Sequence, residues 1–249
     1  MTEASVRTPP TTGSRLVYAV GDIHGHTDAL RPLLRELADD LARSRPAERP
    51  LLVFLGDYVD RGPDSRGVID TILALEADGP FEVVCLKGNH EDALLRVLAD
   101  ADFGPNWIGN WGQATLRSYG VAVPPFGQEA AETARVQAEL AAALPRRHQD
   151  FLRRCVMSLT VGDYLFVHAG VRPGVALEAQ EDRDLMWIRY DFLESDEDFG
   201  KVVVHGHTPS DRPERKANRI GIDTGVYYSG VLTAVRLEGA DQRFIQASA

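Results

Sequence analysis

The sequence has very little cysteine, no long apolar run and no signal-like segment. Cys85 and Cys155 are its two cysteines among 249 residues, and their spacing matches no thiolate metal motif, so a cysteine-based metal site is not expected. Cys85 lies in the apolar run 83–86, which predicts a buried, inert thiol. No apolar stretch approaches the ~20 residues of a membrane helix, and residues 1–14 lack the apolar core of a signal peptide. These absences favour a cytoplasmic protein in a reducing compartment.

The sequence also lacks an excess of basic residues. Its formal net charge is −10, so we expect no nucleic-acid partner. An acidic balance agrees with a site that is built from carboxylates and completed by cations, and it agrees equally with a simple gain in solubility. Because the chain has no internal repeat and no low-complexity linker, one core is expected. We therefore predict a flexible tail over residues 1–14 and a single domain over residues 15–249.

Hydrophobic periodicity predicts an α/β fold. Apolar runs at 16–20, 51–55 and 83–86 are typical of strands, and leucines at helical spacing between about Thr27 and Arg43 predict an amphipathic helix. Two more helices are expected, one beginning near Pro63 and one after the third strand. This alternation favours a parallel sheet with right-handed crossovers. The less regular stretch 103–127 is expected to cap a cleft, helices are expected at 129–154, and strands at 156–161, 164–167, 201–204, 219–222 and 231–237.

Polar side chains of similar type stand where five of the predicted strands end. In α/β sheets the carboxyl ends of strands converge on one crevice, so these side chains are expected to lie together. Gly-Asp and Gly-Asn pairs are also ordinary turn chemistry. Turn chemistry does not explain histidine, and five of the seven histidines lie in these segments. The five segments are Gly21-Asp22-Ile23-His24-Gly25, Gly56-Asp57-Tyr58-Val59-Asp60-Arg61-Gly62, Gly88-Asn89-His90-Glu91, Val167-His168-Ala169-Gly170 and Val204-His205-Gly206-His207-Thr208.

The residue types in these segments indicate a metal site. Oxygen and nitrogen ligands without thiolate suit Mn²⁺, Fe or Zn²⁺, and an asparagine ligand adds a preference for harder ions, so we favour manganese. The ligand count is sufficient for two ions if one carboxylate bridges them. Two cations roughly 3.5–4 Å apart can acidify a shared water and stabilise both ends of an in-line phosphoryl displacement.

The motifs GDIHG, GDYVDRG, GNHE, VHAG and GHT occur in this order, and together they resemble a known family. From about Arg15 onward, the chain resembles the calcineurin-like metallophosphoesterase superfamily. Within it, the chain looks like the PPP-type serine/threonine protein phosphatases in their compact bacterial and phage form. The resemblance implies a β-sandwich of two mixed sheets flanked by helices, and a single catalytic domain.

The resemblance also implies a role for each motif residue. The first metal would be held by Asp22, His24 and the bridging Asp57, and the second by Asp57, Asn89, His168 and His207. The general acid would be His90, with Asp60 orienting its ring, and the phosphate would be bound by Arg61 and Arg189. A guanidinium suits a tetrahedral phosphate, and a histidine near neutrality can supply a proton. Supporting positions are expected for His205, Glu91 and Asp223, none of them as a metal ligand.

Three functions remain open on the sequence. The leading hypothesis is metal-dependent hydrolysis of phosphomonoesters, foremost phosphoserine and phosphothreonine in proteins. The second is hydrolysis of dinucleoside polyphosphates, because symmetric diadenosine tetraphosphate hydrolases resemble the same motif set, but in them the acidic residue matching Asp60 is commonly missing and the GNH motif ends in Asp. Asp60 and Glu91 therefore favour the first hypothesis. The third is a non-catalytic metal-binding module. The expected partner is a phosphorylated protein or small phosphoester, with no membrane, and the sequence does not fix the oligomeric state.

Overall fold

Two five-stranded mixed sheets form the centre of the molecule in the computed structural model, which describes residues 9–124 and 130–249. The first sheet has the order β10-β9-β1-β2-β3. Strands β1, β2 and β3 run parallel to one another, β9 pairs antiparallel with β1, and β10 pairs antiparallel with β9. Its strands are β1 (Val17–Val20), β2 (Leu51–Phe54), β3 (Glu82–Cys85), β9 (Val231–Glu238) and β10 (Asp241–Ser248). The predicted parallel arrangement of the first three strands is confirmed.

The second sheet has the order β4-β5-β6-β8-β7. Strands β5, β6 and β8 run parallel, and β4 and β7 pair antiparallel at the two edges. Its strands are β4 (Ser158–Val161), β5 (Tyr164–Val167), β6 (Val202–His205), β7 (Glu214–Arg215) and β8 (Arg219–Gly221). The α/β sandwich of two mixed sheets expected from the resemblance is therefore present. Strands β7 and β10 were not predicted.

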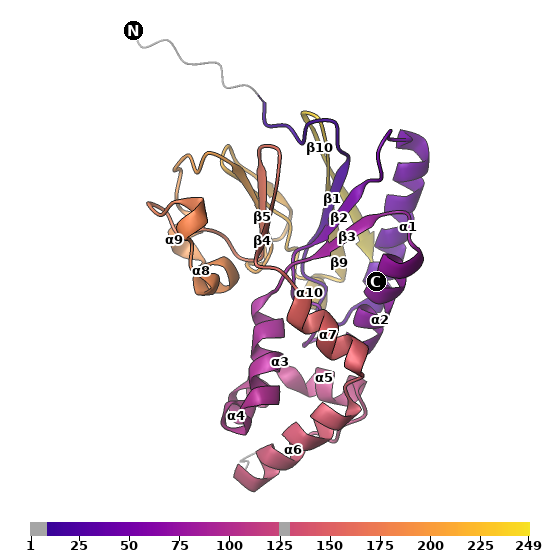
Figure 1. Ribbon diagram of the computed structural model, residues 1–249, viewed down its shortest axis with the longest axis vertical. Helices are drawn as coiled ribbons and strands as arrows, with labels where there is room; N and C mark the ends of the chain where they lie inside the picture. The colour runs from indigo at the N-terminus through magenta and orange to yellow at the C-terminus, as the bar shows by residue number, and fades with distance from the viewer. Residues whose placement is uncertain (1–8, 125–129) are drawn as a thin grey trace.

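Helices cover the outer faces of the sandwich and extend one end of it (Figure 1). Helices α1 and α2 pack on the first sheet, α8 and α9 lie beside the second, and α3 to α6 form a separate lobe. The helices are α1 (Thr27–Ser44), α2 (Ser65–Asp78), α3 (Asn89–Ala99), α4 (Gly104–Trp107), α5 (Gln113–Ser118), α6 (Ala130–Ala143), α7 (Arg146–Arg154), α8 (Asp182–Trp187), α9 (Tyr190–Leu193) and α10 (Val226–Ser229). Short 3₁₀ turns are η1 (Ala101–Phe103) and η3 (Leu177–Ala179), and η2 (Ile108–Gly112) is a π-helical turn.

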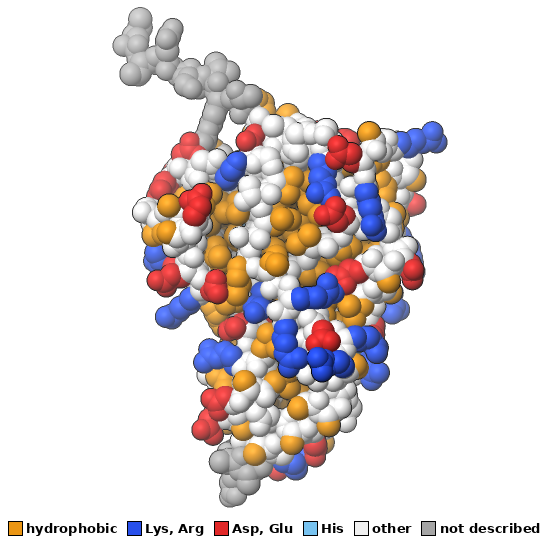
Figure 2. Space-filling model, in the orientation of Figure 1, with side chains coloured by type: hydrophobic (Ala, Val, Ile, Leu, Met, Phe, Trp, Pro, Cys, Tyr) orange, Lys and Arg blue, Asp and Glu red, His pale blue; other side chains and the backbone are white. Residues whose placement is uncertain are grey.

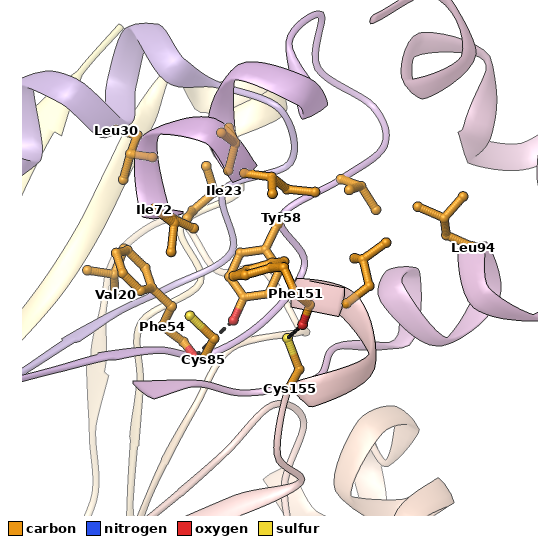
Figure 3. Close-up of a cluster of buried hydrophobic side chains, with 14 of the residues drawn as sticks. Val20, Ile23, Leu30, Phe54, Tyr58, Ile72, Cys85, Leu94, Phe151 and Cys155 are labelled. Carbon is orange, nitrogen blue, oxygen red and sulfur yellow. Dashed lines mark hydrogen bonds between the residues drawn. The ribbon is translucent and has the colours of Figure 1, made fainter. Parts of the chain in front are cut away.

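The alternation of side chains along β1 divides the core into two layers. Val17 and Ala19 face the second sheet, whereas Tyr18 and Val20 face the helices. Figure 3 shows part of the helix-side layer, in which Phe54, Tyr58 and Phe151 pack closely. Cys85 belongs to this layer as a free, buried thiol, as predicted, and burial raises its pKa well above the ordinary value.

The N-terminal segment and the stretch expected to cap a cleft are only partly described by the structure. Residues 1–8 of the expected tail lie outside the described residues. Farther along, Thr11 donates its N–H to Asp163 Oδ2 at 3.0 Å and Thr12 donates its N–H to the Gly239 carbonyl. The expected irregular stretch contains the short elements η1, α4, η2 and α5, and its last residues, 125–127, also lie outside the described part.

Surface charge and helix length each bear on which kinds of partner the protein can bind. On the face shown in Figure 2, acidic and basic side chains are interspersed, with basic groups gathered near the junction of the helical lobe and the sandwich. The net charge of −10 therefore does not produce a uniformly negative surface on that face. Among the described residues, none of the helices combines the length and apolar character needed to cross a bilayer.

Candidate metal centre

The candidate site lies where strands of both sheets end at the same edge of the sandwich. Asp22 follows β1, Asp57 follows β2, and His168 directly follows β5, so parallel strands deliver these side chains to one place. Asn89 is the first residue of α3, after β3, and His207 lies two residues beyond β6. The predicted convergence of the strand ends is thus present in the fold.

Two buried groups of side chains at this edge could each hold a metal ion. One consists of His24, Asp57 and His90, and the other of Asp57, His168 and His207; within each group the ligand atoms lie within 4.8 Å of one another. Asp57 belongs to both. Its Oδ2 lies 3.5 Å from His24 Nε2, and its Oδ1 lies 3.4 Å from His168 Nε2. The two carboxylate oxygens therefore face different groups, which is the geometry that a bridging ligand requires.

The remaining expected ligands lie beside these groups. Asn89 Oδ1 is 3.0 Å from His168 Nε2, which places it at the second group. Both carboxylate oxygens of Asp22 accept from the His207 backbone N–H, at 3.2 and 3.0 Å, and Asp22 belongs to neither group. His90, expected as the general acid, is a member of the first group, with Nε2 3.9 Å from Asp57 Oδ2.

Backbone carbonyls orient the histidine rings toward the site. His24 Nδ1 lies 3.0 Å from the Val59 carbonyl, and His168 Nδ1 lies 2.9 Å from the Leu55 carbonyl. A proton on Nδ1 satisfies each carbonyl and leaves the Nε2 lone pair directed at Asp57. Burial lowers the pKa of His24 to about 3 and that of His207 to about 2, so both imidazoles are neutral and able to ligate near pH 7.

The carboxylates of Asp22, Asp57 and Asp223 lie close enough to affect one another's charge. Burial, and then the charges of Asp223 and Asp57, raise the pKa of Asp22 well above its ordinary value. Burial raises the pKa of Asp223 to about 6. Because the imidazoles are neutral and the carboxylates repel one another's negative charge, divalent cations fit this set of donors. Nitrogen and oxygen donors of this kind suit manganese, iron or zinc alike.

The backbone at the site is strained. In the described residues, six non-glycine residues have positive φ, and all but Arg45 carry site side chains: His24, Asp57, Asp60, Arg61 and His207. Such conformations cost on the order of 1–3 kcal/mol each and persist where the surroundings hold them. Glu91, fully buried, accepts from the backbone N–H groups of Asp57, Tyr58 and Gly88 at 2.8, 2.8 and 2.9 Å. It therefore fixes the loop that carries Asp57 to the start of α3.

The expected phosphate-binding arginines line one cavity with the metal-binding groups. Arg61 and Arg189 border a cavity of about 190 Å³ together with His24, Asp57 and His90. The Arg61 guanidinium stacks 4.4 Å from the ring centre of Tyr227, and Arg189 Nε donates to His207 Nε2 at 3.1 Å. A second cavity of about 530 Å³ shares Arg189 and Trp187 with the first.

Some contributors to the site were missed or assigned a lesser role by sequence reasoning. Asp223, expected to support a loop, lines the 190 Å³ cavity, and its charge helps to raise the pKa of Asp22. Tyr227 and Trp111 line it as well, and the Trp111 ring lies 5.1 Å from His90. His205, by contrast, is buried against Phe192 and belongs to neither metal-binding group. Asp223 also ends a strand, which is the signal that could have identified it.

Two His/Asp groups that share one carboxylate, at the edge where two mixed sheets end, are consistent with a dinuclear metal site in an α/β protein. A family model described as calcineurin-like phosphoesterase matches residues 16–230, so the chain belongs to this family of metallophosphoesterases. The family implies hydrolysis of a phosphoester.

Similar proteins carry several different phosphoester-hydrolysing activities in their names. The chain is 32% identical over 230 residues to serine/threonine-protein phosphatase 1 of Salmonella typhimurium, covering 90% of this chain and 93% of that protein. It is 26% identical over 235 residues to the asymmetrical bis(5'-nucleosyl)-tetraphosphatase PrpE of Anoxybacillus flavithermus, covering 87% and 88%. A solved cold-active protein-tyrosine phosphatase of a Shewanella species shares the fold, with a TM-score of 0.60 at 16% identity over 99% of this chain and 85% of that one.

Proposed function

We propose that this metallophosphoesterase hydrolyses phosphomonoesters, foremost phosphoserine and phosphothreonine in proteins. The observation that carries the proposal is the buried pair of His90 and Asp60. His90 Nδ1 lies 2.7 Å from Asp60 Oδ2, and His90 Nε2, on the other side of the ring, lies 3.9 Å from Asp57 Oδ2. A histidine held in this way supplies a proton to a leaving oxygen, which a serine or threonine alkoxide needs because it is a very poor leaving group.

The other site residues complete this role in the proposal. Metal ions would be held by Asp22, His24, Asp57, Asn89, His168 and His207. Bound divalent cations supply polarisation of the phosphoryl oxygens and acidify the attacking water. Arg61 and Arg189, on the same cavity, bind the remaining phosphoryl oxygens and stabilise the charge that develops on them. Manganese is our preferred ion, with iron or zinc as alternatives.

A second candidate is hydrolysis of dinucleoside polyphosphates. The 530 Å³ cavity next to the site, with the exposed rings of Trp187 and Tyr190, has room and stacking surface for a nucleoside. The similarity to the PrpE enzymes agrees with this candidate. A nucleotide phosphate, however, is a good leaving group and needs no proton, so the buried acid pair favours the phosphoprotein.

The test compares leaving groups. We expect His90→Asn to reduce kcat on a phosphoserine peptide by about 10²–10⁴-fold and to affect p-nitrophenyl phosphate much less, because general acid catalysis benefits the more basic leaving group. Asp60→Asn should show a weaker form of the same selectivity. Metal content is measured for each variant, so that loss of an ion is not mistaken for loss of the acid.

Three outcomes would change the proposal. Equal losses on the two substrates would remove the acid role from His90. Much faster turnover of diadenosine tetraphosphate than of any phosphopeptide by the unmodified enzyme would select the second candidate. Full metal binding without turnover of any phosphoester would indicate a non-catalytic module.

A further inference from the structure

Asp60, the partner of His90, is held by two residues from a distant helical segment. Trp107 donates its Nε1–H to Asp60 Oδ2 at 2.9 Å, and Thr115 donates its hydroxyl to Asp60 Oδ1 at 2.6 Å. The Thr115 oxygen also accepts the Asp60 backbone N–H at 2.9 Å. Since Asp60 has φ of 70°, Thr115 stabilises both its carboxylate and its left-handed backbone. All three side chains are fully buried, so water cannot replace these contacts.

The π-helical turn η2 explains how both donors reach one carboxylate. Trp107 and Thr115 are eight residues apart, and at ~100° per residue an unbroken α-helix would place them about 80° apart around its axis. A π turn takes up one extra residue, so eight positions across it correspond to seven in an α-helix, which lie on nearly the same face. Both Trp107 and Thr115 accordingly donate hydrogen bonds to the Asp60 carboxylate. Trp111, between them, stacks near His90, and its carbonyl accepts the Arg61 N–H at 3.4 Å.

A glycine within this turn makes room for the Trp107 ring. A Cβ at Gly112 would lie 2.3 Å from Trp107 Cε2 and 2.4 Å from Cδ2, closer than side-chain atoms approach. Because the Trp107 ring is completely buried, it cannot move aside without leaving Asp60. Gly109, in the same π turn, offers a contrast, because a Cβ there would meet no atom within 4 Å.

We infer that Trp107 and Thr115 are positioning residues for the His90–Asp60 acid pair, and that Gly112 in the π turn permits that positioning. The inference rests on the proposed acid role of His90. The two donors fix the plane of the Asp60 carboxylate, so that Oδ2 meets His90 Nδ1 and the opposite ring nitrogen stays directed at the leaving oxygen. When either donor is lost, the carboxylate can rotate and the ring loses its orientation. The cost falls on the step that transfers the proton.

The experiment measures kcat and KM of the metal-loaded, full-length enzyme on phosphoserine peptide and on p-nitrophenyl phosphate. For Trp107→Phe, Thr115→Val and Gly112→Ala, we expect kcat on the peptide to fall by about 10- to 100-fold, a part of the general-acid contribution. On p-nitrophenyl phosphate the fall should be less than about 3-fold, and KM should be unchanged. Thr115→Ser keeps the hydroxyl and should restore peptide turnover, and Gly109→Ala should match the unmodified enzyme on both substrates.

The controls separate this inference from the proposed function. If Asp60→Asn shows no selectivity between the two substrates, the acid role itself fails. If Asp60→Asn is selective while Trp107→Phe and Thr115→Val lose activity equally on both substrates, or lose none, only the positioning role is overturned. Equal behaviour of Gly112→Ala and Gly109→Ala would overturn the part assigned to Gly112. Should Gly112→Ala fail to fold, the Thr115→Val and Thr115→Ser pair decides the positioning role.

Discussion

Because Asp57 belongs to both metal-binding groups, its loss should remove the stabilisation that metal ions give to the fold. Ligands that bind only the native state stabilise it by mass action. In the unmodified protein, Mn²⁺ should bind at two groups that share Asp57, and Asp57→Asn should weaken both. Removing His24 or His207, each of which belongs to one group, should weaken one site and spare the other.

The expected magnitude follows from the number of ions. At a free concentration of 100 times its Kd, each ion contributes about 2.7 kcal/mol, so two contribute about 5 kcal/mol. For a domain of roughly 150–250 residues, 1 kcal/mol shifts Tm by about 2–4 °C, which predicts a rise of about 10–20 °C on adding Mn²⁺ to metal-free protein. His24→Asn and His207→Asn should show about half of that rise, and Asp57→Asn little of it.

The assay is thermal unfolding of each protein after chelation, with and without Mn²⁺. His148→Asn is the matched control, because His148 is a buried histidine that bonds Tyr119 and Asp70 and belongs to neither group. The substitution should lower the Tm of the metal-free protein, but the metal-induced rise should equal that of the unmodified protein. A full rise in Asp57→Asn, or half the rise in His148→Asn, would refute the assignment of Asp57 as the shared ligand.

Two further predictions concern the arginines and the pH dependence of stability. Arg61→Ala and Arg189→Ala should each lower kcat/KM by about 10²-fold or more, because each removes a preorganised donor. If either variant matches the unmodified enzyme in its kinetics, another residue must bind the phosphate in that position. The pKa of Asp40 lies below its ordinary value. Burial alone would raise it, but hydrogen bonds from Tyr18 and Arg236 outweigh the effect of burial. The stabilisation from Asp40 is therefore complete above the ordinary aspartate range and is lost as pH falls through the lowered pKa. Free energies of unfolding between pH 7 and pH 3 should fall more steeply in the unmodified protein than in Asp40→Asn, and parallel curves would contradict this.

Local patterns account for the parts of the fold and site that could be predicted. Short apolar runs that end in Gly-Asp or His identify β1, β2 and β5, and parallel strand ends meet at one edge for topological reasons. Strand β10 has no such signal, because it is an edge strand whose residues 241–248 mix polar and apolar types and pair along the full length of β9. Residues 241–248 therefore form a strand because they pair with β9.

Contacts between distant parts of the chain account for what was missed. Thr115 lies 55 positions from Asp60 and Trp107 lies 47 positions from it, so no motif around GDYVDRG points to them. The register that joins them depends on a π turn, which depends on tertiary packing and has no short sequence signature. The Asp22 carboxylate also accepts from the His207 backbone N–H, a contact between the ends of β1 and β6 that no local motif indicates.

If Asp57 bridges two metal ions, both ions should be visible beside its carboxylate in an anomalous difference map from crystals grown with Mn²⁺. We expect two peaks roughly 3.5–4 Å apart. One should lie beside Asp57 Oδ2 and His24 Nε2, and the other beside Asp57 Oδ1 and His168 Nε2. A single peak, or two peaks that do not share Asp57, in crystals of enzyme that hydrolyses phosphoesters at full rate would contradict the bridging role of Asp57.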